Sequence, residues 1–205
     1  MVVIIDYKAG NVGSIQNMLK RIGINSTITS DIQAIENASK LILPGVGHFD
    51  YGMHQLHASG LVPLLTQKVL QQHTPILGIC LGVQLFTEGS EEGVEKGLGW
   101  IKGRTVAFDR SQLLPKQKVP HMGWATVADY QHSKLFEGMP ADPRFYFVHS
   151  YHLQLEQAAD CLVKAHYGYD FAAGIEHGNI LGVQFHPEKS HKFGMKLLHN
   201  FINNY

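Results

Sequence analysis

The 205-residue chain carries 17 lysines and arginines against 17 aspartates and glutamates, so its formal net charge at neutral pH is zero. A balanced charge provides no overall field for nucleic acid or an anionic membrane, and we expect neither as a partner. No apolar run approaches the roughly 20 residues that span a bilayer, and the first residues lack a signal-peptide pattern. Two cysteines make no disulfide framework. We therefore expect a cytoplasmic protein with a single domain, 1–205.

The first half of the chain alternates between short apolar runs and amphipathic segments. Apolar runs predict buried strands over 2–5, 26–30, 41–43 and 75–80. Helices are expected from Asn11, from Asp31 and within 56–72, the last broken near Gly60 and Pro63. Strand–helix alternation predicts a parallel sheet with helices on both faces, whose ligands bind at the carboxyl ends of the strands.

The second half follows a different pattern. Short β-like runs predict antiparallel or mixed strands added to the parallel core, over 105–108, 144–149, 161–165, 171–176 and 180–184. The glycine- and glutamate-rich segment 87–103 is expected to be a loop with a solvated acidic face. Residues 119–124 are expected to form an apolar and aromatic loop that belongs either to the core or to a partner-facing surface. A final helix is expected from about Ser190.

The segment 75–86 is the most informative part of the first half. It reads as a short strand that stops at Cys80 and continues at once as a helix, with Gly78 and Gly82 as neighbours that add no bulk. This pattern is typical of a nucleophile elbow, in which a reactive side chain sits on a strained turn at a helix N-terminus. A helix N-terminus favours an anion and hence a thiolate. The segment alone is equally consistent with a small buried cysteine of no chemical role.

Two further segments carry chemistry. Gly45 and Gly47 form a loop after the third strand, which suits either a backbone anion site or a plain tight turn. Pro187 keeps His186 extended, so that Glu188 can reach the imidazole, although a histidine beside a surface glutamate is the simpler interpretation of that segment alone. Taken together with Cys80, the three segments supply a nucleophile, a base with its orienting carboxylate, and an oxyanion site.

These motifs together resemble the class I, triad-type glutamine amidotransferases. Leu-Gly-Ile-Cys-Leu-Gly at 77–82 and Gln-Phe-His-Pro-Glu at 184–188 carry the resemblance to the class. Pro-Gly-Val-Gly at 44–47 and Pro-His-Met-Gly-Trp at 120–124 are similar to the glutaminase subunits of imidazole glycerol phosphate synthase. The resemblance covers essentially the whole chain. It implies an α/β, flavodoxin-like three-layer sandwich with a mostly parallel central sheet and additional antiparallel strands in the second half.

The resemblance also implies roles for individual residues. Cys80 would be the nucleophile, His186 the general base and acid, and Glu188 the orienting carboxylate of a reaction that releases ammonia from glutamine through a cysteinyl thioester. The oxyanion hole would involve Val46, Gly47 and Leu81. Glutamine would be bound by Gly45, Gln84, His149, Ser150 and Tyr151. The scattered histidines show no zinc-site spacing, and neither metal nor cofactor is implied.

The resemblance further implies a partner. Family members form a heterodimer with a (β/α)8-barrel cyclase subunit, which uses the ammonia to make imidazole glycerol phosphate and aminoimidazole carboxamide ribotide in histidine biosynthesis. Asn11, Trp124 and Lys189 match positions that the family places toward that subunit. The chain departs from the family pattern at Lys8-Ala9, at His48 and at Ala125, and Lys8 and Ala125 leave the details of the interface open.

Other functions stay open from sequence. A glutaminase serving another synthase would share the three catalytic positions but not the motif at 120–124. A cysteine peptidase of related topology would need an open groove. A docking subunit without activity commonly loses a catalytic position, and Cys80, His186 and Glu188 are all present. Cys161, which has no histidine and acid pair of its own, is interpreted as structural.

Overall fold

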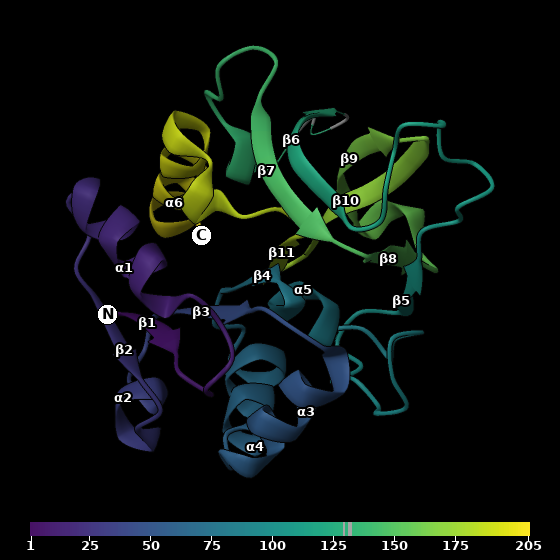
Figure 1. The fold of residues 1–205 in the computed structure, drawn as a ribbon. Helices are drawn as coiled ribbons and strands as arrows, with labels where there is room; N and C mark the ends of the chain where they lie inside the picture. Colours follow the sequence, from purple (N-terminus) through teal and green to yellow (C-terminus); the bar gives the residue numbers. More distant parts are fainter. Residues whose placement is uncertain (129, 131–132) are drawn as a thin grey trace.

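The computed structural model describes residues 1–128, 130 and 133–205. Its core is one twisted sheet with the strand order β2-β1-β3-β4-β11-β10-β9-β6-β7 (Figure 1). The first five strands in that order run parallel to one another. They are β2 (Ser26–Thr29), β1 (Val2–Ile5), β3 (Lys40–Gly45), β4 (Ile76–Cys80) and β11 (Ile180–Val183). The predicted parallel core is therefore confirmed, and it brings the ends of β3 and β4 side by side.

The remaining strands are antiparallel to their neighbours. β10 joins this part to the core by pairing with β11 on one side and β9 on the other, while β8 pairs with β10 and β5. The bounds are β5 (Gly103–Ala107), β6 (His121–Ala128), β7 (Arg144–His149), β8 (Tyr151–Leu155), β9 (Cys161–Tyr167) and β10 (Tyr169–His177). This confirms the expected addition of antiparallel strands in the second half.

Helices cover both faces of the parallel sheet. α1 (Val12–Arg21) and α6 (His191–Asn204) contact each other on one face. The other face carries α2 (Ile32–Glu36), α3 (Phe49–Ala58), α4 (Val62–Thr66) and the π-helical turn η1 (Gln67–Gln71) (Figure 1). Alternate residues of β1 supply the two cores: Val2 and Ile4 pack toward α1 and α6, and Val3 and Ile5 pack toward the opposite helices. The result is the expected three-layer α/β sandwich.

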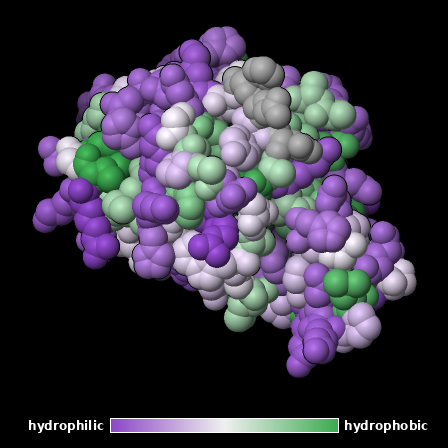
Figure 2. All heavy atoms as spheres, turned by 90° about the horizontal axis from the view of Figure 1, so that it is seen from above, coloured by the Kyte–Doolittle hydropathy of each residue, from purple (hydrophilic) through white to green (hydrophobic). Residues whose placement is uncertain are grey.

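Shorter helical pieces complete the chain. α5 (Leu81–Leu85) follows β4 directly, and three 3-10 turns are present at η2 (Lys134–Phe136), η3 (Ala158–Asp160) and η4 (Pro187–Lys189). Within residues 1–128, 130 and 133–205, the helices are all too short or too polar to cross a bilayer. The face seen in Figure 2 is largely hydrophilic, with apolar side chains in small separate groups.

The structure differs from the sequence-based expectations at two elements. Residues 119–124 are not a loop: from His121 onward they belong to β6, which pairs with β7 and β9. Helical structure begins before the expected residue 56, at Phe49; the expected break near Gly60 and Pro63 is present, because α3 ends at Ala58 and α4 begins at Val62 with Pro63 in its first turn. Proline is tolerated in a first turn because its missing N–H has no intrahelical partner there. β8 was not predicted, because its burial does not alternate: His152 and Leu153 are adjacent and both buried.

Candidate active site

Cys80 lies on a strained turn between strand and helix. β4 ends at Cys80, α5 begins at Leu81, and Cys80 has φ 54° and ψ −112°, a conformation rarely adopted by a non-glycine residue. The close packing beneath the turn explains its two glycines. A Cβ on Gly82 would overlap the carbonyl oxygen of Leu43, and one on Gly78 would come within 2.8 Å of the Val83 backbone. The predicted elbow is present.

His186 and Glu188 form a buried pair. The Nδ1 atom of His186 lies 2.7 Å from Oε1 of Glu188, and the two side chains are 2% and 1% exposed. A carboxylate accepts, so Nδ1–H donates to Glu188, and Nε2 is the ring nitrogen that gains or loses a proton. Nε2 is buried without a hydrogen-bond partner among the described residues. Burial lowers the pKa of His186, but interactions with Cys80 and Glu188 outweigh it and raise the pKa from 6.5 to about 10.

The backbone around His186 is held by α6 and β7. The N–H of His186 donates to the carbonyl of Tyr146 at 2.9 Å. The buried hydroxyl of Ser190 donates to the His186 carbonyl at 2.6 Å and accepts from the Tyr146 N–H at 3.0 Å. Gly194 lets α6 approach closely, since a Cβ there would overlap the Pro187 carbonyl. These bonds restrict how far the imidazole can move relative to the sheet.

A hollow of about 440 Å³ contains both Cys80 and His186. It brings together seven other residues singled out from sequence: Val46, Gly47, Leu81, Gln84, His149, Ser150 and Tyr151. Gly45 and Glu188 do not line it. Gly45 lies beside Cys80 in the β3–β4 register, and a Cβ there would meet the Tyr7 hydroxyl at 2.7 Å. That hydroxyl is buried and has no hydrogen-bond partner in the part of the chain that the structure describes, and burial together with Cys80 raises the pKa of Tyr7.

Glu92 also lines this hollow, and sequence reasoning missed it. Its Oε2 accepts the backbone N–H of Phe49 at 2.8 Å, which ties the acidic segment to the start of α3. Glu91 and Glu88 are bound as well, to the Ala107 N–H and the Lys102 ammonium. The expectation that this acidic run is only a solvated face was therefore wrong. Nothing in the sequence sets Glu92 apart from the neighbouring glutamates; its place twelve residues after Cys80 becomes informative only in the folded chain, where its loop returns to the start of α3.

The three residues predicted to face a partner are all exposed. Trp124 is 46% exposed and stacks on His191 with centroids 5.5 Å apart, beside a hollow of about 540 Å³ that Arg144, Lys192 and Phe193 also line. Lys189 places its ammonium 5.6 Å from the Tyr146 ring centroid, and that ring lies 6.1 Å from Trp124. Asn11 precedes α1 next to Gly10, which packs on Pro44. Trp124 and Lys189 thus form one surface around Tyr146.

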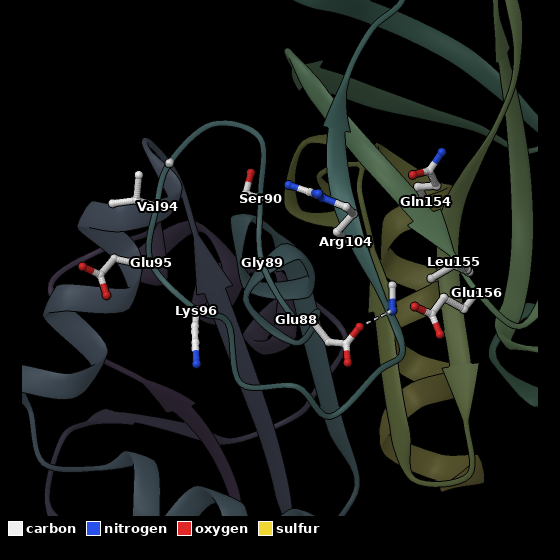
Figure 3. A pocket seen from close by; sticks show the side chains of 12 residues that line it. Glu88, Gly89, Ser90, Val94, Glu95, Lys96, Arg104, Gln154, Leu155 and Glu156 are labelled. Atoms are coloured by element: carbon white, nitrogen blue, oxygen red, sulfur yellow. Dashed lines mark hydrogen bonds between the residues drawn. The ribbon is translucent and has the colours of Figure 1, made fainter.

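A larger hollow, of about 680 Å³, is lined by neither Cys80 nor His186 (Figure 3). It is bounded by the loop that carries Glu88, Val94 and Lys96, and by the strands that carry Arg104 and Gln154. Its described lining residues include neither cysteine nor histidine. Charges of both signs line it, and Glu88 reaches across to the Gly103 N–H. Size alone therefore does not mark the reactive site of this molecule.

Comparison with known proteins identifies the family. The family model described as "Glutamine amidotransferase class-I" matches residues 3–204. The chain belongs to the class I glutamine amidotransferases. A solved glutamine amidotransferase is 19% identical with a TM-score of 0.72, and covers 98% of this chain and 97% of its own. The PurLQS structure from Thermotoga maritima is 17% identical with a TM-score of 0.73, and covers 99% and 97%. These two structures support the fold of this amidotransferase.

Closer relatives place the amidotransferase in a subfamily. The imidazole glycerol phosphate synthase subunit HisH 2 of Methanococcus maripaludis is 52% identical over 202 residues, covering 98% of each chain. HisH 2 of Pseudomonas aeruginosa is 48% identical with the same coverage. HisH of Sulfurimonas denitrificans is 45% identical, covering 98% of this chain and 97% of its own. The chain is thus a glutaminase-type enzyme of the HisH family, and the resemblance drawn from its motifs is confirmed.

Proposed function

We propose that this chain is the glutaminase subunit of an imidazole glycerol phosphate synthase, with Cys80, His186 and Glu188 as its catalytic triad. The observation that carries the proposal is one hollow that contains the strained Cys80 and a histidine with its Nδ1 held by a buried carboxylate. Only Nε2 of His186 is left to exchange a proton with the thiol. The match over residues 3–204 supports one catalytic domain, 1–205.

The chemistry follows from this arrangement. His186 Nε2 accepts the Cys80 proton, and the sulphur attacks the side-chain carboxamide carbon of glutamine. Collapse of the tetrahedral intermediate breaks the C–N bond, and His186 returns the proton to the leaving ammonia. Water then attacks the glutamyl thioester, with His186 again taking and returning a proton, which releases glutamate and regenerates the thiol. Overall, one glutamine and one water give one glutamate and one ammonia.

Both tetrahedral intermediates carry an oxyanion. We assign its donors to the backbone N–H of Leu81, which follows Cys80, and to an N–H from the Val46–Gly47 segment, which lines the same hollow. Gly47, at φ 102°, gives this segment a conformation that other residues disfavour. Loss of one such donor typically reduces the rate by about 10²- to 10³-fold. Gly45, which precedes this segment, packs closely against Leu81 and Gly82 at the start of α5.

The polar lining suits the amino-acid end of glutamine. Glu92 is a carboxylate placed to attract the α-ammonium group. Gln84 and the segment His149, Ser150 and Tyr151 add amide, hydroxyl and backbone groups that can bind the α-carboxylate and the carboxamide. The open mouth next to exposed Val46 leaves room for glutamine to enter.

We further propose that the ammonia passes to a (β/α)8-barrel cyclase subunit in a heterodimer of histidine biosynthesis. Relatives named as synthase subunits support a partner. The exposed Trp124, with Lys189 and the cationic Arg144 and Lys192 nearby, offers an aromatic anchor with positive neighbours. Direct transfer is an advantage because ammonia in neutral water becomes ammonium, which is not a nucleophile.

The test is glutamate release from glutamine by the purified chain, alone and mixed with its cognate cyclase and nucleotide substrate. Activity that rises with the cyclase and is abolished in Cys80→Ala would support the proposal. Absence of activity in a demonstrated complex would leave a docking subunit instead. Full activity that never responds to a cyclase would remove the synthase assignment while keeping a glutaminase.

A further inference from the structure

A chain of buried amides and imidazoles runs beneath the reactive cysteine. Gln184 is fully buried after β11, with its backbone N–H donating to the Ala173 carbonyl at 2.9 Å. Its Nε2 lies 3.8 Å from the Cys80 sulphur, and its Oε1 accepts from Gln84 Nε2 at 3.0 Å. Gln184 therefore contacts both the thiol and a residue of the substrate hollow, although it does not line that hollow itself.

The Tyr151 carbonyl fixes the orientation of both amides. It accepts from Gln84 Nε2 at 3.2 Å, and a carbonyl can only accept, so the nitrogen of Gln84 must point that way. The second hydrogen on that nitrogen then points at Gln184, which must present its oxygen. The nitrogen of Gln184 is consequently the end directed at Cys80. With both hydrogens of its nitrogen used, Gln84 keeps Oε1 as the group available to a ligand.

The same carbonyl also fixes two histidine tautomers. His149 Nδ1 lies 2.8 Å from the Tyr151 oxygen and must donate, so His149 Nε2 can only accept. It does so from His121 Nδ1 at 3.1 Å. Burial lowers the pKa of His121 to about 4 and that of His149 to about 3, so both rings are neutral at neutral pH and keep these roles. Every hydrogen bond of the network, from His121 in β6 to Cys80, thus has one donor and one acceptor.

We infer that Gln184 is a positioning residue of the glutaminase, which directs an N–H donor at the Cys80 sulphur and holds the Gln84 amide so that its oxygen faces glutamine. The inference rests on the proposed role of Cys80 as nucleophile. A donor aimed at sulphur favours the thiolate over the thiol, because a hydrogen bond to a charged acceptor is stronger than one to a neutral acceptor. His121 anchors the far end of the network.

Gln184→Met tests the inference, because methionine fills a similar volume without the donor or the acceptor. We expect alkylation of Cys80 by iodoacetamide at neutral pH to slow about tenfold, kcat to fall, and KM for glutamine to rise. Gln154→Met, the same change at an exposed position outside the site, serves as the matched control and should alter none of these values. A folded Gln184→Met protein with unchanged alkylation rate, kcat and KM would overturn the inference and leave Gln184 as a space-filling residue.

A pair of variants at His121 keeps the test decisive if Gln184→Met fails to fold. Asparagine places a side-chain N–H near the position of His121 Nδ1, whereas leucine does not. We expect His121→Leu to raise KM about threefold or more and His121→Asn to restore it; equal KM values in the two variants and the parent would overturn the network.

Different results would contradict the proposed function and the inference about Gln184. If Cys80→Ala retained glutaminase activity, the nucleophile assignment would be wrong whatever Gln184 does. Slower alkylation of Cys80 in Gln184→Met supports the inference without any turnover, because that reaction needs no glutamine.

Discussion

At the scale of single residues, the account depends on the ion pair that Glu188 makes with His186. Glu188→Gln removes the charge but keeps the shape. Because Glu188 is one of the groups that raise the pKa of His186, the pKa should fall and the imidazole should be held less firmly in its productive tautomer. We expect kcat for glutamine hydrolysis to drop by roughly 10²- to 10⁴-fold, measured as glutamate release. A loss of less than tenfold in a folded variant would contradict the orienting role.

The buried histidines predict a loss of stability in mild acid. Burial holds the pKa of His121 at about 4 and of His149 at about 3, against 6.5 for an ordinary histidine. Below pH 6.5 the unfolded chain therefore binds protons that the folded chain does not, so the free energy of unfolding falls as pH falls. Each such histidine contributes a slope of up to about 1.4 kcal/mol per pH unit.

Urea denaturation between pH 7 and pH 5.5 measures this slope while most carboxylates stay ionised. His121→Phe should flatten it, and His199→Gln, a change at an exposed histidine, should not. An unchanged slope in His121→Phe would mean that this histidine is not kept neutral by the fold.

The sequence predicted the roles of those site residues whose neighbours in the site are also their neighbours in the chain. Cys80 and its two glycines are adjacent in the chain, and Glu188 is two residues from His186, so local patterns predicted their relation. Glu92, Gln184 and His121 were missed because their contacts cross large sequence distances. Gln184 meets Gln84 one hundred residues away, and nothing in either local pattern indicates the contact.

At the scale of elements, the elbow depends on close approach of α5 to β3. Gly82→Ala would put a methyl group on the Leu43 carbonyl oxygen, while Gly13→Ala in α1 adds a methyl group with no atom within 4 Å. Alanine is also the better helix former by about 1 kcal/mol. We expect Gly13→Ala to keep or raise the melting temperature and Gly82→Ala to lower it by several degrees with loss of activity. Equal melting temperatures would contradict the tight packing beneath Cys80.

The elements of the parallel half were predictable because each carries its own pattern. β1, β3 and β4 are continuous apolar runs, and the amphipathic spacing of α1 indicated its buried face. β6 was not predictable in this way. Its burial alternates, but its outward positions carry Met122 and Trp124, so the polar half of the usual strand pattern is missing. Those exposed apolar residues are the ones expected at a docking surface.

At the scale of the whole molecule, the site lies at the carboxyl ends of β3 and β4, with the exposed surface of Trp124 and Lys189 as the proposed contact with a cyclase. Trp124→Ala should weaken that complex by roughly 30-fold or more, as expected for a central aromatic anchor. The dissociation constant can be measured by calorimetry. Leu70→Ala is the control, since Leu70 is comparably exposed but lies in η1, which precedes the amino end of β4, whereas Cys80 is at the carboxyl end of that strand. Equal effects of the two substitutions would place the interface elsewhere.

The most direct test of the central claim uses the two cysteines of the chain. A glutamine analogue with an electrophilic diazoketone in place of the carboxamide should alkylate the residue that attacks glutamine, and peptide mass spectrometry locates the adduct. The account predicts one adduct, on the peptide with Cys80, whose formation glutamine slows and which ends glutamate release. An adduct on Cys161, or glutamate release that persists after Cys80 is fully modified, would contradict the assignment of Cys80 as the nucleophile.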